Sequence, residues 1–377
     1  MIQFELDTDR RLFEDAMAFA QSQVRSLIEK HPDFYPLHTE GGQWQHDMPI
    51  WTHWCDGFLP GMMWIFHRYL GAGDPRADWW MDQAIRYTKP LEKRKFDDNT
   101  HDHGFILMPT YLRWYQVTEQ PELKQVLLTA GQTLAQRYQE RGAYLCSFAA
   151  ENSNFIDIMM NVGLIFYASR ETGDQLLRDI ALRHCLTTRK YLVRGDGSVA
   201  HEGIFDIETG EFLHHATQQG WRPDSCWSRG LAWALYGFSL CYEYSRDPRF
   251  LETAQACAHY YITHANADGV PAWDFNAPTD SGRMVDTSAA AITASGLFRL
   301  CRMVPDPIKA HFYWTTAVRI TRSLCEKHLA KGTPGWEGVL KNSVYHMHKG
   351  LGVNESVIWG DFYLVEAIEL AMRQLRG

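Results

Sequence analysis

The chain has 377 residues, more than one ordinary domain, so its length suits either two domains or one large closed architecture. Its formal net charge of -8 argues against a nucleic-acid-binding protein, and no uninterrupted apolar stretch is long enough to cross a membrane. Aromatic residues make up 13% of the chain, which suits a large core and also a cleft that stacks on flat rings.

The eight cysteines are scattered without a CxxC pair, and several fall in apolar helical runs, as Cys241 does between Leu240 and Tyr242. This distribution is typical of reduced, packed thiols and not of a disulfide framework. The N-terminal segment MIQFELDTDRRLFEDAM lacks the basic and apolar stretches of a signal peptide. We therefore expect a cytoplasmic protein, present as a monomer or a homodimer.

In chain order, the sequence repeats one unit: an apolar helix, a tight turn, an amphipathic helix and a long polar and aromatic loop. Most of the tight turns place an N-cap residue directly before a proline, which suits the first turn of a helix. These pairs are Asp74-Pro75, Gln120-Pro121, Asp247-Pro248 and Asp306-Pro307. The pattern predicts five helical hairpins, over residues 57–93, 104–140, 156–193, 228–264 and 287–329.

The two ends of the chain complete a sixth pair, because residues 10–30 and 361–376 each have a helical pattern. That makes twelve helices, with short strands expected only near 197–200 and 269–272. The first helix of each hairpin is the more apolar and the richer in small residues, which suits an inner position in a closed ring. We therefore predict an all-α fold, a toroid of six hairpins in a single domain over residues 1–377.

In such a toroid every long loop leads into the start of an inner helix, so the loops gather at one mouth, where a site is expected. Five aspartates lie near the starts of inner helices: Asp56, Asp102, Asp157, Asp286 and Asp361. Helix capping explains such positions well, since Asp is a favoured N-cap. Two of them favour another role. Asp157 is flanked by apolar residues, and desolvation raises a carboxyl pKa toward that of a general acid. Asp102 lies in an acid-rich loop that could face Asp157, and two carboxyl groups in different environments suit acid/base chemistry.

Other chemistries lack their motifs. A metal site at His101-Asp102-His103 is one alternative, but the sequence has no HExxH, and neither His346-Met347-His348 nor His214-His215 has the i, i+4 spacing of two metal ligands on one helix. It has no G-x-S-x-G elbow, no Walker loop and no G-x-G-x-x-G after a strand. We therefore expect neither a metal nor a cofactor.

Most of the chain, from about residue 50 onward, carries a series of family motifs. In order they are WTHWCDGFLPGMMWIFHRYLGAGD, HDHGF, FIDIMMN followed by ETGD, TQQG followed by CWSRGLAWALYGF, FLETA, VPAWDFNAPTD followed by DTSAAAITASGLF, and SVYHMHKG followed by ESVIWGDFYLVEA. Together they resemble the unsaturated glucuronyl hydrolases of glycoside hydrolase family 88. The resemblance implies an (α/α)6 barrel that removes a 4,5-unsaturated uronic acid from the non-reducing end of small oligosaccharides left by polysaccharide lyases, without a metal or nucleotide.

The resemblance also implies roles for particular residues. Asp157 matches the general acid/base and Asp102 the second essential carboxylate. Residues matching substrate contacts and the aromatic wall of the pocket are His101, His201, Gln219, Arg229, Tyr345, Trp54, Trp227 and Trp233. Arg229 has an argument of its own, because a planar charged fork suits a substrate carboxylate; a structural salt bridge to a loop acid is the alternative. For the tryptophans the alternative is core packing.

The chain departs from the usual family pattern at His103, where an apolar residue is common, and at Gln218, where a histidine is common. In the C-terminal loop, His346, His348 and Lys349 could meet a sulfate or a second sugar, or form a solvated surface loop. Two other functions fit this barrel: an unsaturated rhamnogalacturonyl hydrolase acting on pectin fragments, and a sugar epimerase or binding barrel, for which histidine pairs would be expected.

Overall fold

The computed structural model describes residues 2–46, 50–278 and 284–376, and helices dominate it. The outer helices are α1 (Ile2–Lys30), α3 (Pro75–Thr88), α6 (Pro121–Ala135), α8 (Gln175–Tyr191), α10 (Pro248–His264) and α12 (Pro307–Lys327). The inner helices are α2 (Phe58–Leu70), the continuous run of α4 (His103–Leu107), η3 (Met108–Leu112) and α5 (Arg113–Thr118), then α7 (Gly163–Thr172), α9 (Ser228–Ser245), α11 (Thr287–Leu300) and α13 (Ile358–Arg376).

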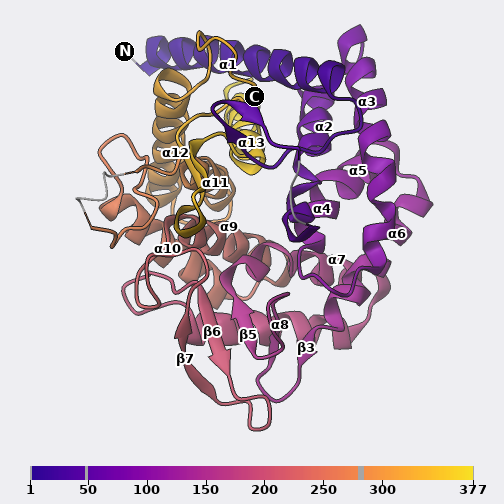
Figure 1. The fold of residues 1–377 in the computed structure, drawn as a ribbon, viewed down its shortest axis with the longest axis vertical. Coiled ribbons are helices and arrows are strands. Elements are labelled where there is room, and N and C mark those ends of the chain that lie inside the picture. The colour runs from indigo at the N-terminus through magenta and orange to yellow at the C-terminus, as the bar shows by residue number, and fades with distance from the viewer. Residues whose placement is uncertain (1, 47–49, 279–283, 377) are drawn as a thin grey trace.

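The inner helices close into a ring, as the ribbon in Figure 1 shows. Helix α13 packs against both α11 and α2, and contacts continue from α2 through η3, α4, α7 and α9 back to α11. Helix α1, from the other end of the chain, packs against α12 and α13 and completes the outer layer. The predicted all-α toroid of six hairpins, an (α/α)6 barrel, is confirmed. Its assignment as a single domain over residues 1–377 stays a prediction.

The inner helices are buried over much of their length, because each packs against neighbouring inner helices and an outer helix. In α11 every residue from Thr287 to Phe298 is buried. Small residues let these backbones approach closely: a Cβ atom built on Gly104 would lie 2.5 Å from the Cα atom of Asn161. The main core runs without interruption from Phe13 in α1 to Met372 in α13. All eight cysteines are buried within this core or beside it, and none forms a disulfide bond in the described chain.

Most of the tight turns form the helix caps that their residues predict. The carboxylates of Asp74, Asp247 and Asp306 cap α3, α10 and α12 by accepting backbone N–H bonds. Gln120 occupies the N-cap position of α6 without a side-chain cap bond. The end helices are longer than predicted: the helix expected over 10–30 begins at Ile2, and the one expected over 361–376 begins at Ile358.

The strand predictions are wrong. Residues 197–200 and 269–272 contribute only isolated bridges, Val193 with Val199 and Ala272 with Val285. The strands lie in other parts of the long loops, in small antiparallel sheets. These are β1 (Thr39–Glu40) with β2 (Gln43–Trp44), β3 (Tyr138–Gln139) with β4 (Tyr144–Leu145), β5 (Ser153–Phe155) with β6 (Glu202–Phe205) and β7 (Phe212–Ala216), and β8 (Ser343–His346) with β9 (Leu351–Glu355).

Short 3-10 helices complete the loops: η1 (Ile50–Cys55), η2 (Lys89–Phe96), η4 (Ile156–Met160) and η5 (Met347–Lys349). The segment η3 is a π-helix, so the inner helix 103–118 is wider in its middle than at its ends. In the described part of the chain, no helix is both long and apolar enough to cross a bilayer.

Candidate active site

A cavity of about 280 Å³ lies where the long loops meet the starts of the inner helices. Both catalytic candidates, Asp102 and Asp157, line it. Six of the eight predicted substrate contacts line it as well: Trp54, His101, Gln219, Arg229, Trp233 and Tyr345. The other two, His201 and Trp227, do not line the cavity. They lie behind the lining residues and contact some of them.

The register of a small sheet positions Asp157. Strand β5 pairs with β6 so that Phe155 lies opposite Glu202, and the Ile156 N–H then donates to the His201 carbonyl at 2.9 Å. Asp157 follows at once in η4, and its Oδ2 atom lies 3.6 Å from His201 Nε2. A pairing between two distant loops therefore brings the acid and the imidazole together.

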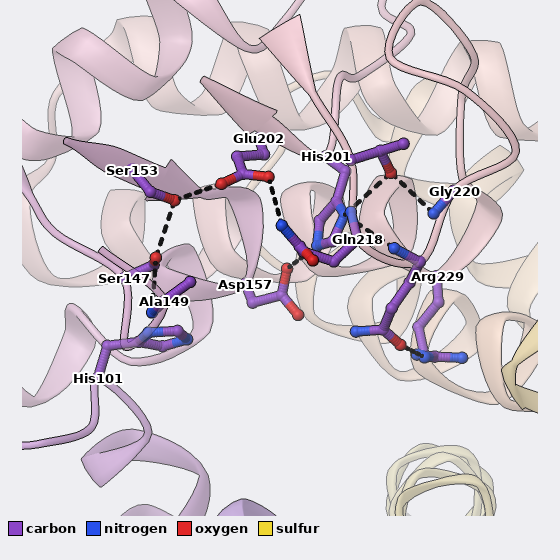
Figure 2. Close-up of polar contacts among 12 residues, drawn as sticks. His101, Ser147, Ala149, Ser153, Asp157, His201, Glu202, Gln218, Gly220 and Arg229 are labelled. Atoms are coloured by element: carbon purple, nitrogen blue, oxygen red, sulfur yellow. Dashed lines mark hydrogen bonds and ion pairs between the residues drawn. The ribbon is translucent and has the colours of Figure 1, made fainter. Parts of the chain in front are cut away.

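The hydrogen bonds of His201 define its tautomer. Its Nδ1 atom accepts the backbone N–H of Gln218 at 3.0 Å and faces the N–H of Gln219 at 3.4 Å, so that nitrogen carries no proton. Burial and, to a smaller extent, the nearby Arg229 charge lower the pKa of His201 to about 3. The ring is neutral at pH 7, and its single N–H, on Nε2, points toward Asp157 (Figure 2).

Asp157 lies in the setting of a general acid. Burial raises its pKa to about 7, the Arg229 guanidinium opposes this, and the negative charges of Asp102 and Glu202 add to it. Within the described residues, its Oδ2 atom has no hydrogen-bond partner. The carboxyl group therefore keeps its proton near neutral pH and can deliver it to a bound molecule.

Asp102 is also paired with a neutral histidine, but its carboxyl group ionises more readily than that of Asp157. His101 accepts the Phe148 N–H on Nδ1 at 3.0 Å, so its Nε2–H faces Asp102 Oδ1 at 3.3 Å. Burial raises the pKa of Asp102 to about 6, while a hydrogen bond from the Thr100 hydroxyl, at 2.6 Å, favours the charged form. Asp102 is therefore the more readily ionised of the two acids.

One side chain links the two acid-bearing segments. Asn161, at the end of η4, accepts the Phe105 N–H on its Oδ1 atom at 2.9 Å and donates from Nδ2 to the Asp157 carbonyl at 3.2 Å. Gly104 permits this contact, because any side chain there would collide with Asn161. The spacing of Asp102 and Asp157 is thus set by contact between two neighbouring inner elements.

Arg229 is 1% exposed at the start of α9. It forms the salt bridge that was the alternative to substrate binding, with Asp286 at 3.3 Å, and it also donates to the backbone carbonyls of Val344 and Tyr345. One guanidinium nitrogen additionally donates to the Gln219 side chain, which lines the cavity. Arg229 is therefore held rigidly by buried groups and keeps one partner, Gln219, that a bound carboxylate could replace.

Aromatic rings form the wall beside the acids. Trp54 contacts Phe105 at 5.2 Å between ring centroids, and Phe105 contacts Trp233 at 5.0 Å. Trp227 supports the site from behind, with its ring 4.4 Å from the Arg229 guanidinium carbon and 4.7 Å from the His201 ring. The predicted tryptophans thus combine packing with site formation, and Trp227 acts only through packing.

Several supporting residues were not anticipated from the sequence. Figure 2 shows a hydrogen-bonded chain from Ser147 through Ser153 and Glu202 to Gln218. Glu202 directly follows His201 in the sequence. An acidic residue next to a predicted site histidine is therefore the sequence signal that could have revealed it. This chain fixes Gln218, one of the two departures from the family pattern, at the rim of the cavity.

Capping explains only one of the five aspartates. Asp286 caps α11 through the Ser288 N–H. Asp361 instead accepts the N–H groups of Val339 and Leu340, from the loop before its helix. Asp56 faces His53 at 3.4 Å and Arg94 at 3.7 Å. Asp361 shares with Asp157 a pKa raised by burial to about 7, but its two backbone donors assign it to structure.

The remaining histidines divide between packing and the cavity. His103 is fully buried, and burial lowers its pKa to about 4, so a neutral ring occupies the position where the family often has an apolar residue. In the C-terminal loop, His346 and Lys349 line the cavity, while the Nε2 atom of His348 lies 2.7 Å from the Gly220 carbonyl oxygen. This loop is therefore part of the site's rim.

A larger cavity of about 690 Å³ adjoins the first and shares Trp54, Asp102 and Phe148 with it. Among the described residues, no three His, Cys, Asp or Glu side chains are grouped so that they could hold a metal ion.

Comparisons with known proteins agree with this geometry. The model of the family described as Glycosyl Hydrolase Family 88 matches residues 25–333. An unsaturated glucuronyl hydrolase of Formosa agariphila is 34% identical over 332 residues, 86% of this chain and 81% of the relative. An unsaturated chondroitin disaccharide hydrolase of Streptococcus pyogenes serotype M1 is 29% identical over 367 residues, 94% and 89% of the two chains. The crystal structure of an unsaturated glucuronyl hydrolase specific for heparin superposes with a TM-score of 0.88 at 27% identity, covering 97% of this chain and 98% of that one.

Fold, site and relatives together define a glycoside hydrolase built on an (α/α)6 barrel. The chain belongs to glycoside hydrolase family 88.

Proposed function

We propose that this enzyme releases a 4,5-unsaturated uronic acid from the non-reducing end of glycosaminoglycan-type oligosaccharides produced by polysaccharide lyases. The observation that carries the proposal is the buried carboxyl group of Asp157, whose pKa burial raises to about 7, beside His201 and facing the same cavity as Asp102 and Arg229. The names of the relatives support the substrate class.

The substrate contains a vinyl ether, with a double bond between C4 and C5 and the ring oxygen on C5. Asp157 donates its proton to C4, and positive charge develops on C5 and the ring oxygen. The carboxylate left on Asp157 then accepts a proton from a water molecule whose oxygen adds to C5. The resulting hemiketal opens by breaking the bond between C5 and the ring oxygen, and C1 expels the aglycone as an alcohol.

His201 supports both states of Asp157. Its Nε2–H lies 3.6 Å from Oδ2, close enough to strengthen into a hydrogen bond when negative charge appears on the carboxylate. Because the Nδ1 atom is held by backbone N–H groups, the ring does not compete for the proton. The acid can therefore give up its proton and recover it without a change of tautomer in its neighbour.

Asp102 and Arg229 act on the two charges of the substrate. Asp102, ionised above about pH 6, stabilises the developing positive charge electrostatically. Arg229 binds the uronate carboxylate in place of the Gln219 side-chain oxygen. The tryptophan and phenylalanine rings of the wall pack against the sugar ring.

A panel of unsaturated disaccharides tests this function. The enzyme is incubated with lyase products of chondroitin, hyaluronan, heparin and pectin, and the loss of conjugated ultraviolet absorbance is followed. We expect turnover of at least one glycosaminoglycan product by the wild type and by Asp306→Asn, which keeps its cap, and no detectable turnover by Asp157→Asn. Turnover of the pectin product alone would reject the substrate class, and unchanged turnover by Asp157→Asn would reject the mechanism.

We also propose that the enzyme acts in the cytoplasm, as a monomer or a homodimer. All eight cysteines are buried and none is joined in a disulfide in the described chain, which supports this, since disulfides are rare in reducing compartments. Cell fractionation with an antibody against the chain, and light scattering of the purified protein, test the two statements.

A further inference from the structure

A second cavity, of about 200 Å³, lies further along the ring axis, toward the C-terminal ends of the inner helices. Its lining comes from α2, α4, η3, α5, α9, α11 and α13, so it lies inside the same ring as the catalytic cavity. Phe105 lines both cavities and separates them. Nothing in the proposed reaction uses this second space.

The charged side chains that line the second cavity are mostly basic, whereas the chain as a whole is acidic. The protein has 45 acidic and 37 basic side chains, yet the second cavity is lined by five arginines and only two carboxylates. The arginines are Arg68, Arg113, Arg299, Arg302 and Arg373, and the carboxylates are Glu366 and Glu369. Five guanidinium groups around one small space repel one another unless negative charge balances them.

The two carboxylates are already engaged. Glu369 binds Arg68 through two contacts of 2.5 Å and also meets Arg373 at 3.5 Å. Glu366 binds Arg113 at 2.6 Å and accepts the Tyr236 hydroxyl at 3.1 Å. Within the lining, these two carboxylates can balance only two of the five guanidinium charges, and Glu369 is shared between Arg68 and Arg373.

Positive charge therefore remains at one side of the cavity. Glu243 pairs with Arg299 from outside the lining, at 2.5 Å, but the Arg299 Nε–H is buried and meets no acceptor in the described parts of the chain. Arg302 is exposed and makes no ion pair or side-chain hydrogen bond with any residue that the structure describes. Burial lowers the pKa of Arg373, and the nearby charges of Arg68 and Arg302 act in the same direction.

The inner helix that spans residues 103–118 is irregular where it lines the second cavity. The π-helix η3 supplies Met108, Pro109 and Leu112 to the lining, and Pro109 has no N–H with which to continue the helical ladder. Such wide turns are frequent at functional sites. If the arginines served only to balance the dipoles of helix C-termini, they would meet terminal carbonyls. The hydrogen bonds observed here go to carboxylates and a hydroxyl.

We propose that this second cavity binds a small tetrahedral oxyanion of the phosphate or sulfate class, held by Arg302 and Arg299 with help from Arg373. Guanidinium groups bind such oxyanions through paired, charge-assisted N–H bonds. The cavity of about 200 Å³ has room for one oxyanion together with ordered waters. The site is independent of the proposed reaction.

Calorimetric titration of the intact protein tests the site, with sodium phosphate, sodium sulfate and sodium acetate in separate runs at pH 7 and low chloride. We expect one saturable site for phosphate or sulfate and weaker binding of the planar acetate. Arg302→Gln should weaken oxyanion binding at least fivefold without changing KM for the disaccharide. Arg141→Gln is the matched control, because Arg141 is also a surface arginine, 60% exposed and paired with Glu208 far from the cavity.

Arg373→Gln provides a second variant, expected to weaken binding in the same direction, and circular dichroism checks that each variant is folded. The proposal is overturned if neither tetrahedral anion binds, if acetate binds more tightly than both, or if both variants bind like the wild type. Binding that survives in both variants and competes with the disaccharide would place the anion at Arg229 in the catalytic cavity instead.

Discussion

The catalytic cavity contains two acid and imidazole pairs of almost identical construction. In each, a backbone N–H occupies Nδ1 of a neutral histidine, and the Nε2–H faces an aspartate. They differ in what else reaches the carboxyl group. Asp102 receives the Thr100 hydroxyl at 2.6 Å, whereas Oδ2 of Asp157 has no hydrogen-bond partner in the described residues.

That difference separates the two roles. Both groups are desolvated, but the hydrogen bond to Asp102 favours its charged form, so its pKa is about 6 and that of Asp157 is about 7. An acid and a carboxylate can therefore coexist in one pocket near neutral pH. The imidazoles have the same geometry in both pairs, and the Thr100 hydroxyl together with the nearby charges makes Asp102 the more readily ionised acid.

The largest expected effect comes from removing each acid in turn. Asp157→Asn should lower kcat by on the order of 10³-fold or more, because the amide cannot supply the proton, and Asp102→Asn by on the order of 10²-fold. The double variant should be little worse than Asp157→Asn alone, since the two groups act in one step. Steady-state kinetics on the best disaccharide measures this, with Asp306→Asn as control. A greater loss from Asp102→Asn would reverse the roles.

Removing each imidazole should have a smaller effect and move the pH dependence. His201→Leu should lower kcat by about 10- to 100-fold and shift the alkaline limb of the profile upward, because loss of the Nε2–H donor disfavours ionised Asp157. His101→Leu should shift the acidic limb upward for the same reason. A fall in kcat with both limbs unmoved would mean that the histidines only maintain the fold.

The wild-type profile of kcat/KM should be bell-shaped. Activity needs Asp157 protonated, so it falls about tenfold per pH unit above about 7, and it needs Asp102 ionised, so it falls below about 6. Thr100→Val removes the hydroxyl that favours ionised Asp102 and should move the acidic limb upward. A profile that stays flat from pH 5 to 8 would contradict the assignment of both groups.

The smallest effect concerns stability. The pKa of Asp157 is raised from its ordinary value of 3.8 to about 7, so the native state loses stability as pH rises between these values. Asp157→Asn should therefore raise the free energy of unfolding at pH 8 by about 1–3 kcal/mol and have little effect at pH 4. Asp102→Asn should raise the free energy of unfolding at pH 8 by a smaller amount. Urea unfolding at both pH values measures this, and a gain of equal size at pH 4 would point to packing.

Local signals predicted the barrel well. An aspartate followed by proline fixes a helix start from neighbouring atoms alone, and Asp74, Asp247 and Asp306 all cap as expected. The strands were missed because each has only two to five residues, too few for a clear alternating pattern, and because β5 and β6 pair across loops that are far apart in the chain. Asp361 was open to a capping interpretation for the same reason, since its donors lie about twenty positions earlier.

The sequence predicted most of the residues of the site, but not the hydrogen bonds that hold them in place. The residues around Asp102 and Asp157 came from motif resemblance and from the apolar flanks of Asp157. The tautomer of His201 depends on the Gln218 backbone, and the anchoring of Arg229 depends on Val344 and Tyr345. These contacts arise only when loops from different hairpins meet, so no periodicity in the sequence reports them.

The bridge made by Asn161 has an evolutionary implication. Because it joins the two segments that carry the acids within the inner ring, the spacing of the acids does not depend on the outermost part of the C-terminal loop. Residues 347–349 of that loop can then diversify and accept new aglycones while the acids and Arg229 stay in place. Grafting a rim loop from a relative of different specificity should therefore change which oligosaccharide is accepted and preserve the chemistry.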